Sequence, residues 1–521
     1  MVNRWLPVLL GAALCCVLVG ASLVGGGEGG LLAWHGGEIY GHRWVQWWWS
    51  EGLDPSALAH GASDWRVIDP LTTALAGLVG WNGVVLGGVA LAFGGGAALA
   101  RQAGGSPVVG GVTLALAPIF LGSLASGLSE DAALGLVALA LALLVTPEAG
   151  SPGTGSPGAG APRWGLRLAG GALLGLAAWC GLYLALIGAA LALLVGVATL
   201  LRERRGWLDW LGSACLAGAL TLPALWGQGE RLAGEGHRLG EVAERAEPLW
   251  RVNPWRGADL ASFFAPGAAP LQPEDLVRLH PAYLGFAALA LALYGGRSRW
   301  WLALIGAMVL STGAGLSFAG APLGVGNPVV EVLSEVPGLS LLNHHGRLLM
   351  GGAIALAVLA ARGAARLTRR FGERAAVACA VAIAAEIALA SPAPLPMPTT
   401  PADIAPIWHT LADGEGAVLV VPMAGPGVNF QRPLYEQRAH GRSLALHVNR
   451  PGWSVVKDPL GRWLSALGQP HTPPAPADPD VSGLKRKGVR TIVVRTPYIA
   501  QVAEVLGAPT RVAEGGAVWD L

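Results

Sequence analysis

Three segments of this 521-residue chain carry acidic, histidine or arginine side chains at spacings that suit binding or catalysis. The first is EIYGHRWVQWWWSEGL, where Glu38 and His42 are four residues apart and would share one face of a helix. Two more acids, Asp64 and Asp69, follow it, and Asp69 precedes a proline and an apolar run. An interfacial collar that carries these acids incidentally would produce the same pattern.

Two later segments combine charge with a position next to apolar runs. The turn SGLSEDA holds Glu130 and Asp131, for which the simplest interpretation is a pair of solvated caps at the start of a helix. The segment PGLSLLNHHGR holds His344, His345 and Arg347. A basic cluster at a membrane surface can bind a lipid phosphate through charge-assisted hydrogen bonds, and a solvated helix start is the alternative. Adjacent histidines do not have a helical metal-ligand spacing, so no metal is expected there.

The tryptophans of the first segment also form a pattern. Trp44, Trp47 and Trp48 follow the i, i+3, i+4 spacing of one helix face. A short helix with an aromatic face and polar neighbours is typical of an element that lies flat at the membrane interface. We therefore expect these side chains to anchor the helix rather than to stack on a sugar.

The composition determines which elements must position these residues. Hydrophobic residues make up 53% of the chain and charged residues 13%, and the mean hydropathy is +0.50. A soluble domain carries roughly 25% charged residues, so most of this chain must face lipid. The net charge of +2 gives no reason to expect a nucleic-acid partner. The five cysteines lie in apolar runs without metal-ligand spacing, which argues against disulfides and zinc.

A helix that crosses about 30 Å of hydrocarbon needs about 20 apolar residues. Eleven stretches qualify as spans, near residues 5–25, 80–100, 106–125, 131–147, 165–181, 183–201, 207–226, 282–296, 300–318, 348–367 and 375–391. Arginines gather in alternate loops, as the positive-inside rule requires when the N-terminus is cytoplasmic. An odd number of spans then places the C-terminus outside. The first span is expected to be an uncleaved anchor rather than a signal peptide.

The predicted fold class is mainly α: a polytopic helical membrane bundle over 1–391, with a small α/β extracytoplasmic domain over 392–521. Within the bundle, 27–70, 227–281 and 319–347 are outer loops, and the Gly/Ser/Pro-rich stretch 148–162 is a flexible cytoplasmic linker.

In the tail, GAVLVVPM and RTIVVRT are strands, VSGLKRKGV and YIAQVAEVLG are helices, and GGAVWDL is an edge strand. The polar stretch YEQRAHGRS, with Glu436, Gln437, His440 and Arg442, is expected to be a surface turn. A binding stretch that faces the membrane domain is the alternative.

In their order along the chain, several of these motifs resemble a known group of proteins. They are the tryptophan-rich helix with IDPL, the SGLSEDA turn, YLGF, PGLSLLNHHGRLLMGG, and then GAVLVVPM, YEQRAHGRSL and KGVRTIVVR. Together they resemble bacterial polytopic membrane proteins of the GT-C glycosyltransferase type, in particular the YfhO-like branch. The resemblance covers nearly the whole chain and implies a GT-C fold in the bacterial inner (cytoplasmic) membrane.

The resemblance also implies a reaction. Such enzymes transfer a sugar, a hexosyl or pentosyl group, from a polyprenyl-phosphate donor to an envelope glycan, lipid or protein at the outer face. The family places an acid, commonly aspartate, in the first outer loop as general base or metal ligand, and Glu38 stands at the matching position. Because glutamate is longer by a methylene, about an ångström, Asp69 and Asp64 remain alternative catalytic carboxylates.

The other implied site residues would bind substrate: His42, Arg43, Glu130, His344, His345 and Arg347. The cofactor stays open. A divalent metal ion, Mg²⁺ or Mn²⁺, would bind at Glu38 and Asp69 if the reaction uses one.

Two rival functions remain, a non-catalytic transporter or assembly protein for lipid-linked glycans and a structural envelope membrane protein. A transporter would bury ionisable groups at mid-membrane, and the predicted spans contain almost none.

Overall fold

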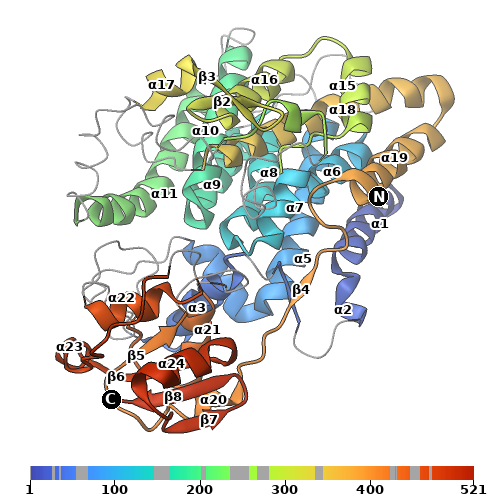
Figure 1. The fold of residues 1–521 in the computed structure, drawn as a ribbon. Helices are drawn as coiled ribbons and strands as arrows, with labels where there is room; N and C mark the ends of the chain where they lie inside the picture. Colours follow the sequence, from blue (N-terminus) through green and yellow to red (C-terminus); the bar gives the residue numbers. More distant parts are fainter. Residues whose placement is uncertain are drawn as a thin grey trace. The chain divides into compact units, whose positions relative to one another are not determined.

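A computed structural model describes residues 2–25, 30–34, 37–53, 69–145, 164–200, 207–234, 257–266, 281–334, 344–422, 429, 431–445, 458–468 and 472–521. The chain forms two compact units, which are described separately. Unit 1 comprises Met1–Gly27 and Ile68–Thr399, and unit 2 comprises Glu28–Val67 and Thr400–Leu521 (Figure 1).

Unit 1 is a helical bundle. Its helices are α1 (Val2–Gly20), α2 (Ser22–Gly25), α5 (Pro70–Gln102), α6 (Pro107–Ala115), α7 (Pro118–Ala125), η1 (Ser129–Ala133), α8 (Leu134–Leu144), α9 (Trp164–Cys180), α10 (Leu182–Leu200), α11 (Trp207–Gly234), η3 (Ala261–Phe263), α15 (Phe286–Gly295), α16 (Trp300–Ser311), α17 (Pro328–Ser334), η5 (His345–Leu348), α18 (Leu349–Phe371) and α19 (Arg374–Ala390). An antiparallel hairpin, β2 (Gly315–Phe318) and β3 (Ala321–Gly326), follows α16. Every predicted span overlaps one of these helices or the pair α6–α7, but the prediction for 300–318 is wrong at its end, because α16 stops at Ser311 and Gly315–Phe318 form the strand β2.

The number of membrane spans stays a prediction. Within the described residues, two helices are long and apolar enough to cross a membrane, Pro70–Gln102 and His345–Phe371. The pair α6–α7, bent by 40°, would make a third. Shorter apolar helical stretches of 10 to 17 residues are Leu6–Gly20, Trp164–Cys180, Leu182–Val197, Phe286–Gly295 and Trp300–Ser311. The helical bundle is therefore observed, whereas the predicted eleven crossings are not confirmed.

Helix α5 begins before its predicted span. The prediction starts near residue 80, but the helix runs from Pro70 and has a kink at Gly80, whose φ is 71°. Only glycine adopts this left-handed conformation without strain, so the kink separates a short first segment from the long one. Asp69 stands at the N-terminus of that first segment.

Glycines let the helices of unit 1 approach closely. A Cβ on Gly95 would lie 2.2 Å from the carbonyl oxygen of Gly135, and one on Gly135 would lie 2.2 Å from the carbonyl oxygen of Leu91. No side chain fits into such spaces, which is how small residues bring helices together in membranes. These contacts hold α5 against α8 and thereby position the turn η1 that precedes α8.

Unit 2 is built on a four-stranded sheet with the order β5-β6-β8-β7. Its strands are β5 (Ala417–Val421), β6 (Val489–Arg495), β7 (Arg511–Ala513) and β8 (Gly516–Asp520); β5 and β6 are parallel and the other pairs antiparallel. The two strands predicted in the tail are thus confirmed as β5 and β6. The prediction of an edge strand at GGAVWDL is wrong, because β7 pairs with the outer side of β8.

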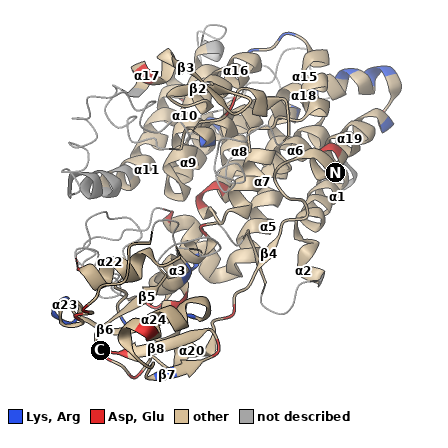
Figure 2. Cartoon of the chain, viewed as in Figure 1, with Lys and Arg blue, Asp and Glu red and all other residues tan. Residues whose placement is uncertain are grey.

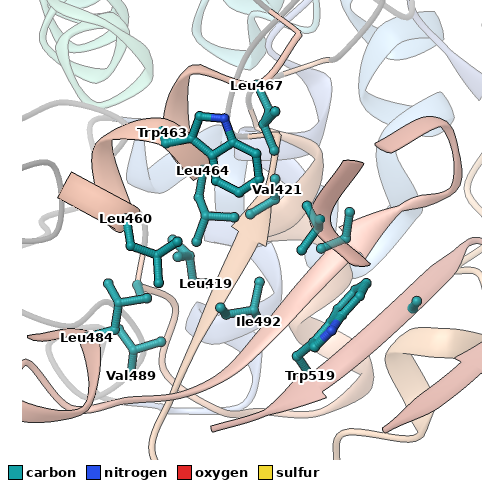
Figure 3. Close-up of a cluster of buried hydrophobic side chains, with 14 of the residues drawn as sticks. Leu419, Val421, Leu460, Trp463, Leu464, Leu467, Leu484, Val489, Ile492 and Trp519 are labelled. Atoms are coloured by element: carbon teal, nitrogen blue, oxygen red, sulfur yellow. The ribbon is translucent and has the colours of Figure 1, made fainter. Parts of the chain in front are cut away.

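Helices cover both faces of this sheet, as the fully buried β5 requires. They are α3 (Ile39–Ser50), α20 (Pro406–His409), α21 (Arg432–Glu436), η6 (Gln437–Ala439), α22 (Pro459–Ala466), α23 (Ser482–Arg486), η8 (Thr496–Tyr498) and α24 (Ile499–Leu506). On one face, Leu419 and Val421 pack with Trp463 of α22 and with Ile492 (Figure 3). Alternate residues of β5 point to the other face. The two-residue strands β1 (Leu31–Leu32) and β4 (Thr399–Thr400) complete the described elements.

The tryptophan-rich helix α3 belongs to that second face. Trp44 and Trp48 are 0% and 6% exposed, and they pack with Val418, Val420 and Trp408. The prediction that they anchor α3 in the membrane interface is therefore wrong. The helix is amphipathic as expected, but its aromatic face is covered by a sheet rather than by lipid. The segment predicted as a loop of the bundle, 27–70, thus contributes most of its described length to unit 2.

The polar stretch YEQRAHGRS is also buried. Glu436, Gln437, His440 and Arg442 are between 0% and 8% exposed, which rules out a surface turn. Arg442 donates to the carbonyl oxygens of Glu415 and Gly416 and to the hydroxyl of Thr491. These side chains satisfy backbone groups at the end of β5, and buried polar groups need such partners.

Candidate active site

Asp69 is held by hydroxyl groups at the start of α5. Its carboxylate accepts hydrogen bonds from Thr72 Oγ1 (2.7 Å, to Oδ2), from Thr73 Oγ1 (3.2 Å, to Oδ1) and from the hydroxyl of Ser129. The sequence DPLTT explains the local part of this arrangement, because residues three and four positions after Asp69 face back towards it on the first turn. The side chain is 2% exposed. Asp69 is therefore an oriented, buried carboxylate.

Glu130 and Arg347 form a buried ion pair. Arg347 Nη1 donates to Glu130 Oε1 at 2.7 Å, and the two residues are 6% and 8% exposed. Arg347 Cζ also lies 5.2 Å from the ring centroid of Tyr183, whose hydroxyl accepts the backbone N–H of His344 at 2.8 Å. These contacts bring η1, α10 and η5 together within unit 1.

Carboxylates outnumber cations in this cluster. Carboxylate oxygens of Asp69 and Glu130 lie within 4.8 Å of one another, and the neighbouring Asp131 is 0% exposed. The acids of SGLSEDA are consequently not the solvated caps that the sequence predicts. Figure 2 shows that most of the helical bundle is drawn in tan and that few Lys, Arg, Asp or Glu residues interrupt it. Two adjacent carboxylates suit the oxygen-binding ions Mg²⁺ and Mn²⁺, so Asp69 and Glu130 fit a divalent cation.

The remaining residues near the cluster are histidines. His344 precedes η5 and His345 begins it. His345 lines a cavity of about 320 Å³ whose other walls are apolar residues of α10, α16, α17, η5 and α18, such as Leu191, Leu310 and Leu348. A cavity of this kind accommodates a hydrocarbon chain, because it offers almost no polar partner.

The other predicted site residues lie in unit 2. Glu38 precedes α3, and its Oε2 lies 4.0 Å from His42 Nε2, so the predicted i, i+4 pairing is confirmed. Arg43 Nη1 donates to Gln46 Oε1 at 2.7 Å. Asp64 lies outside the described residues. Of the predicted site residues, Asp69, Glu130 and Arg347 therefore lie together within unit 1.

Sequence reasoning missed several partners of these groups. No role was assigned from the sequence to Thr72, Thr73 or Tyr183. A tyrosine at the boundary of a predicted span, such as Tyr183, is a signal of polar groups at the membrane surface. Gly181 was missed as well. A Cβ there would lie 2.9 Å from Cβ of Glu130, so the glycine makes room for the acid.

Solved structures share this fold. No protein-family model matches the sequence, and curated proteins gave no significant match. ArnT from Cupriavidus metallidurans, solved bound to undecaprenyl phosphate, is 15% identical over 99% of this chain and 98% of its own, with a TM-score of 0.52. The arabinofuranosyltransferase AftD from Mycobacteria is 17% identical over 95% of this chain, with a TM-score of 0.53. This chain spans only 36% of AftD.

These likenesses define the class of fold. This chain shares its fold with AftD and with ArnT, and at 15–17% sequence identity the likeness is one of fold alone. The fold expected from the resemblance agrees with this finding. The YfhO-like branch, the bacterial origin and the orientation in the inner membrane stay predictions.

Proposed function

We propose that this protein is a glycosyltransferase that transfers a sugar from a polyprenyl-phosphate donor to an envelope glycan, lipid or protein at the outer face of the cytoplasmic membrane. The buried cluster of Asp69, Glu130 and Arg347 carries the proposal, because it combines an oriented carboxylate with a cation. The whole-chain likeness to a structure that was solved with undecaprenyl phosphate supports the choice of donor.

Arg347 and its neighbours would bind the donor. A guanidinium forms strong hydrogen bonds with phosphate oxygens. The backbone N–H of His344 donates to the hydroxyl of Tyr183, whose ring lies beside Arg347. The apolar cavity that begins at His345 would take the hydrocarbon chain of the donor. Phosphate and chain would then be held by the same outer turn, η5.

Asp69 would act as the base. In the proposed reaction the acceptor hydroxyl oxygen forms a bond to the anomeric carbon, and its proton passes to the Asp69 carboxylate. The bond between the anomeric carbon and the phosphate oxygen breaks, and polyprenyl phosphate leaves with the electron pair. Arg347 stabilises the charge that develops on the leaving phosphate.

The alternative carboxylate is Glu38 in unit 2, where His42 would orient it. If a divalent cation binds, Asp69 and Glu130 would hold it, and it would supply further positive charge for the phosphate. The substrate-binding roles of His42 and Arg43 belong to the same proposal.

Sugar transfer from a labelled carrier lipid tests the proposal. Asp69→Asn should lower the rate by about 10²- to 10⁴-fold, the typical contribution of a general base. Asp209→Asn is the matched control, because Asp209 pairs with Arg167 of α9 elsewhere in unit 1. Glu38→Gln is assayed in parallel. A full rate in Asp69→Asn with a large loss in Glu38→Gln would move the base to Glu38, and full rates in both would refute the proposed chemistry.

A further inference from the structure

Helix α3 and the segment α21–η6 lie side by side in unit 2 (Figure 1). The backbone N–H of Gly41 donates to Gln431 Oε1 at 2.9 Å, and Trp44 Nε1 donates to Gln437 Oε1 at 2.7 Å. The rings of Tyr40 and Tyr435 are 5.3 Å apart. These contacts fix one helix against the other, so side chains between them have defined positions.

Two arginines share this junction without a carboxylate between them. Arg438 Cζ lies 4.9 Å from the ring centroid of Tyr435. Burial and the nearby charge of Arg438 lower the pKa of Arg43, so the two guanidinium groups are close enough to repel. Within the part of the chain that the structure describes, neither Arg43 nor Arg438 forms an ion pair with an acid.

The junction also contains buried nitrogen atoms that can donate hydrogen bonds. Arg43 Nε, Arg438 Nε and Gln46 Nε2 are buried and have no hydrogen-bond partner among the residues that the structure describes. Gln46 is 4% exposed, and its Oε1 is occupied by Arg43, which orients the amide nitrogen as a free donor. All three unpartnered atoms are donors. Buried donors that lack acceptors are rare and call for a bound acceptor.

A neighbouring cluster shows an arginine pair that has its own acid. Arg432 and Arg495 both donate to the carboxylate of Glu436, at 3.1 Å and 2.7 Å, although Arg495 Nε itself has no partner among the described residues. Within the described residues, unit 2 thus contains one arginine pair that is neutralised by an acid and a second pair, Arg43 and Arg438, that is not. A bound anion would neutralise the second pair.

We infer that Arg43, Gln46 and Arg438 form a binding site for a phosphate group. Three donors from three side chains match an anion with at least three acceptor oxygens, whereas a carboxylate has two. Arginine suits this role because its planar fork binds phosphate oxygens through two parallel N–H groups. The phosphate can belong to a lipid headgroup or to a soluble phosphate compound. The inference does not rest on the proposed sugar transfer.

Calorimetric titration with inorganic phosphate tests the site in the full chain, reconstituted in phosphatidylcholine nanodiscs. Each variant is compared with the unsubstituted chain, so that any phosphate bound at Arg347 contributes equally to both titrations. Arg43→Gln and Arg438→Gln should each weaken phosphate binding by about 10- to 100-fold, as expected for the loss of a charged hydrogen bond. Arg490→Gln, which removes an exposed arginine of β6, should leave the affinity unchanged. Unchanged affinity in both test variants, or an equal loss in the control, would overturn the site.

Gln46→Glu separates binding from folding. A carboxylate at this position would supply the missing acceptor, so the variant should melt at a higher temperature and no longer bind phosphate. Retention of phosphate binding by Gln46→Glu would contradict the inference even if the arginine variants failed to fold. A second set of nanodiscs with phosphatidic acid identifies the source of the phosphate. If phosphatidic acid competes with inorganic phosphate for the site, the bound phosphate belongs to a lipid headgroup. If it does not compete, the bound phosphate belongs to a soluble compound.

Discussion

Each unit buries a polar turn that contains carboxylates, but the two turns neutralise them differently. In unit 2, Glu436 accepts hydrogen bonds from two arginines, Arg432 and Arg495, so its charge is fully matched. In unit 1, Arg347 matches Glu130 alone, and Asp69 depends on the hydroxyls of two threonines and a serine.

The difference indicates what each turn can do. A carboxylate fixed by two guanidinium groups has little capacity left for a ligand, so the Glu436 cluster is structural. A carboxylate fixed by hydroxyls keeps its negative charge, and it can accept a proton or bind a cation. Perturbed and incompletely neutralised groups of this kind are typical of functional sites.

The largest effect on stability is expected from the ion pair of unit 1. Glu130→Gln leaves Arg347 buried without its counter-ion, which should cost about 3–5 kcal/mol of unfolding free energy. The measurement is unfolding of the full chain in detergent, with Asp209→Asn as the control. Asp209 has 34% of its side chain exposed against 11% for Glu130, so water can replace part of its charge and its loss should cost less than that of Glu130. Equal losses of unfolding free energy in both variants would contradict the expectation that the Glu130–Arg347 pair contributes more than the Asp209–Arg167 pair.

The next effect is a pH dependence in unit 2. Burial, together with the charge of Arg442, lowers the pKa of His440 to about 4 from its ordinary 6.5. The folded state then holds the neutral imidazole while the unfolded state takes up a proton between these values. Stability should therefore fall as the pH drops from 6.5 to 4, by roughly 3 kcal/mol. His440→Gln should remove this part of the pH dependence, and an unchanged profile would assign it to another group.

A smaller effect tests the position of α3. Trp44→Phe keeps an aromatic ring but removes the N–H that donates to Gln437, so unit 2 should lose about 1–2 kcal/mol. Trp49→Phe is the control, since Trp49 is 47% exposed on the same helix. If Trp44 faced lipid as the sequence predicts, the two substitutions would have similar effects in unfolding measurements.

The smallest effect is expected at an exposed ion pair. Arg511 and Asp520 are 3.0 Å apart, but their side chains are 37% and 42% exposed. Arg511→Gln should change the stability by less than about 1 kcal/mol, because solvent and salt screen the pair. Chemical unfolding compares it directly with Glu436→Gln, which should cost more. A larger loss for Arg511→Gln would mean that burial does not decide the strength of these pairs.

The sequence by itself determined the elements that depend on local pattern. Apolar runs predicted helices at all eleven span positions, and β-branched runs predicted β5 and β6, because hydrophobic periodicity acts within a few residues. The same reasoning singled out Glu130, Arg347 and the pair Glu38–His42. It could place Glu38 and His42 together, since they are four residues apart on one helix.

Only the tertiary structure decided which of these residues meet. Asp69 and Ser129 are 60 positions apart, Glu130 and Arg347 are 217 apart, and no local pattern encodes such distances. The tertiary structure also decided what covers an apolar face. The tryptophan face of α3 has the same sequence signature whether lipid or a sheet covers it, and here the sheet strands come from residues more than 350 positions away. Long-range packing, which local spacing cannot specify, therefore determined both the buried cluster of Asp69, Glu130 and Arg347 and the place of α3.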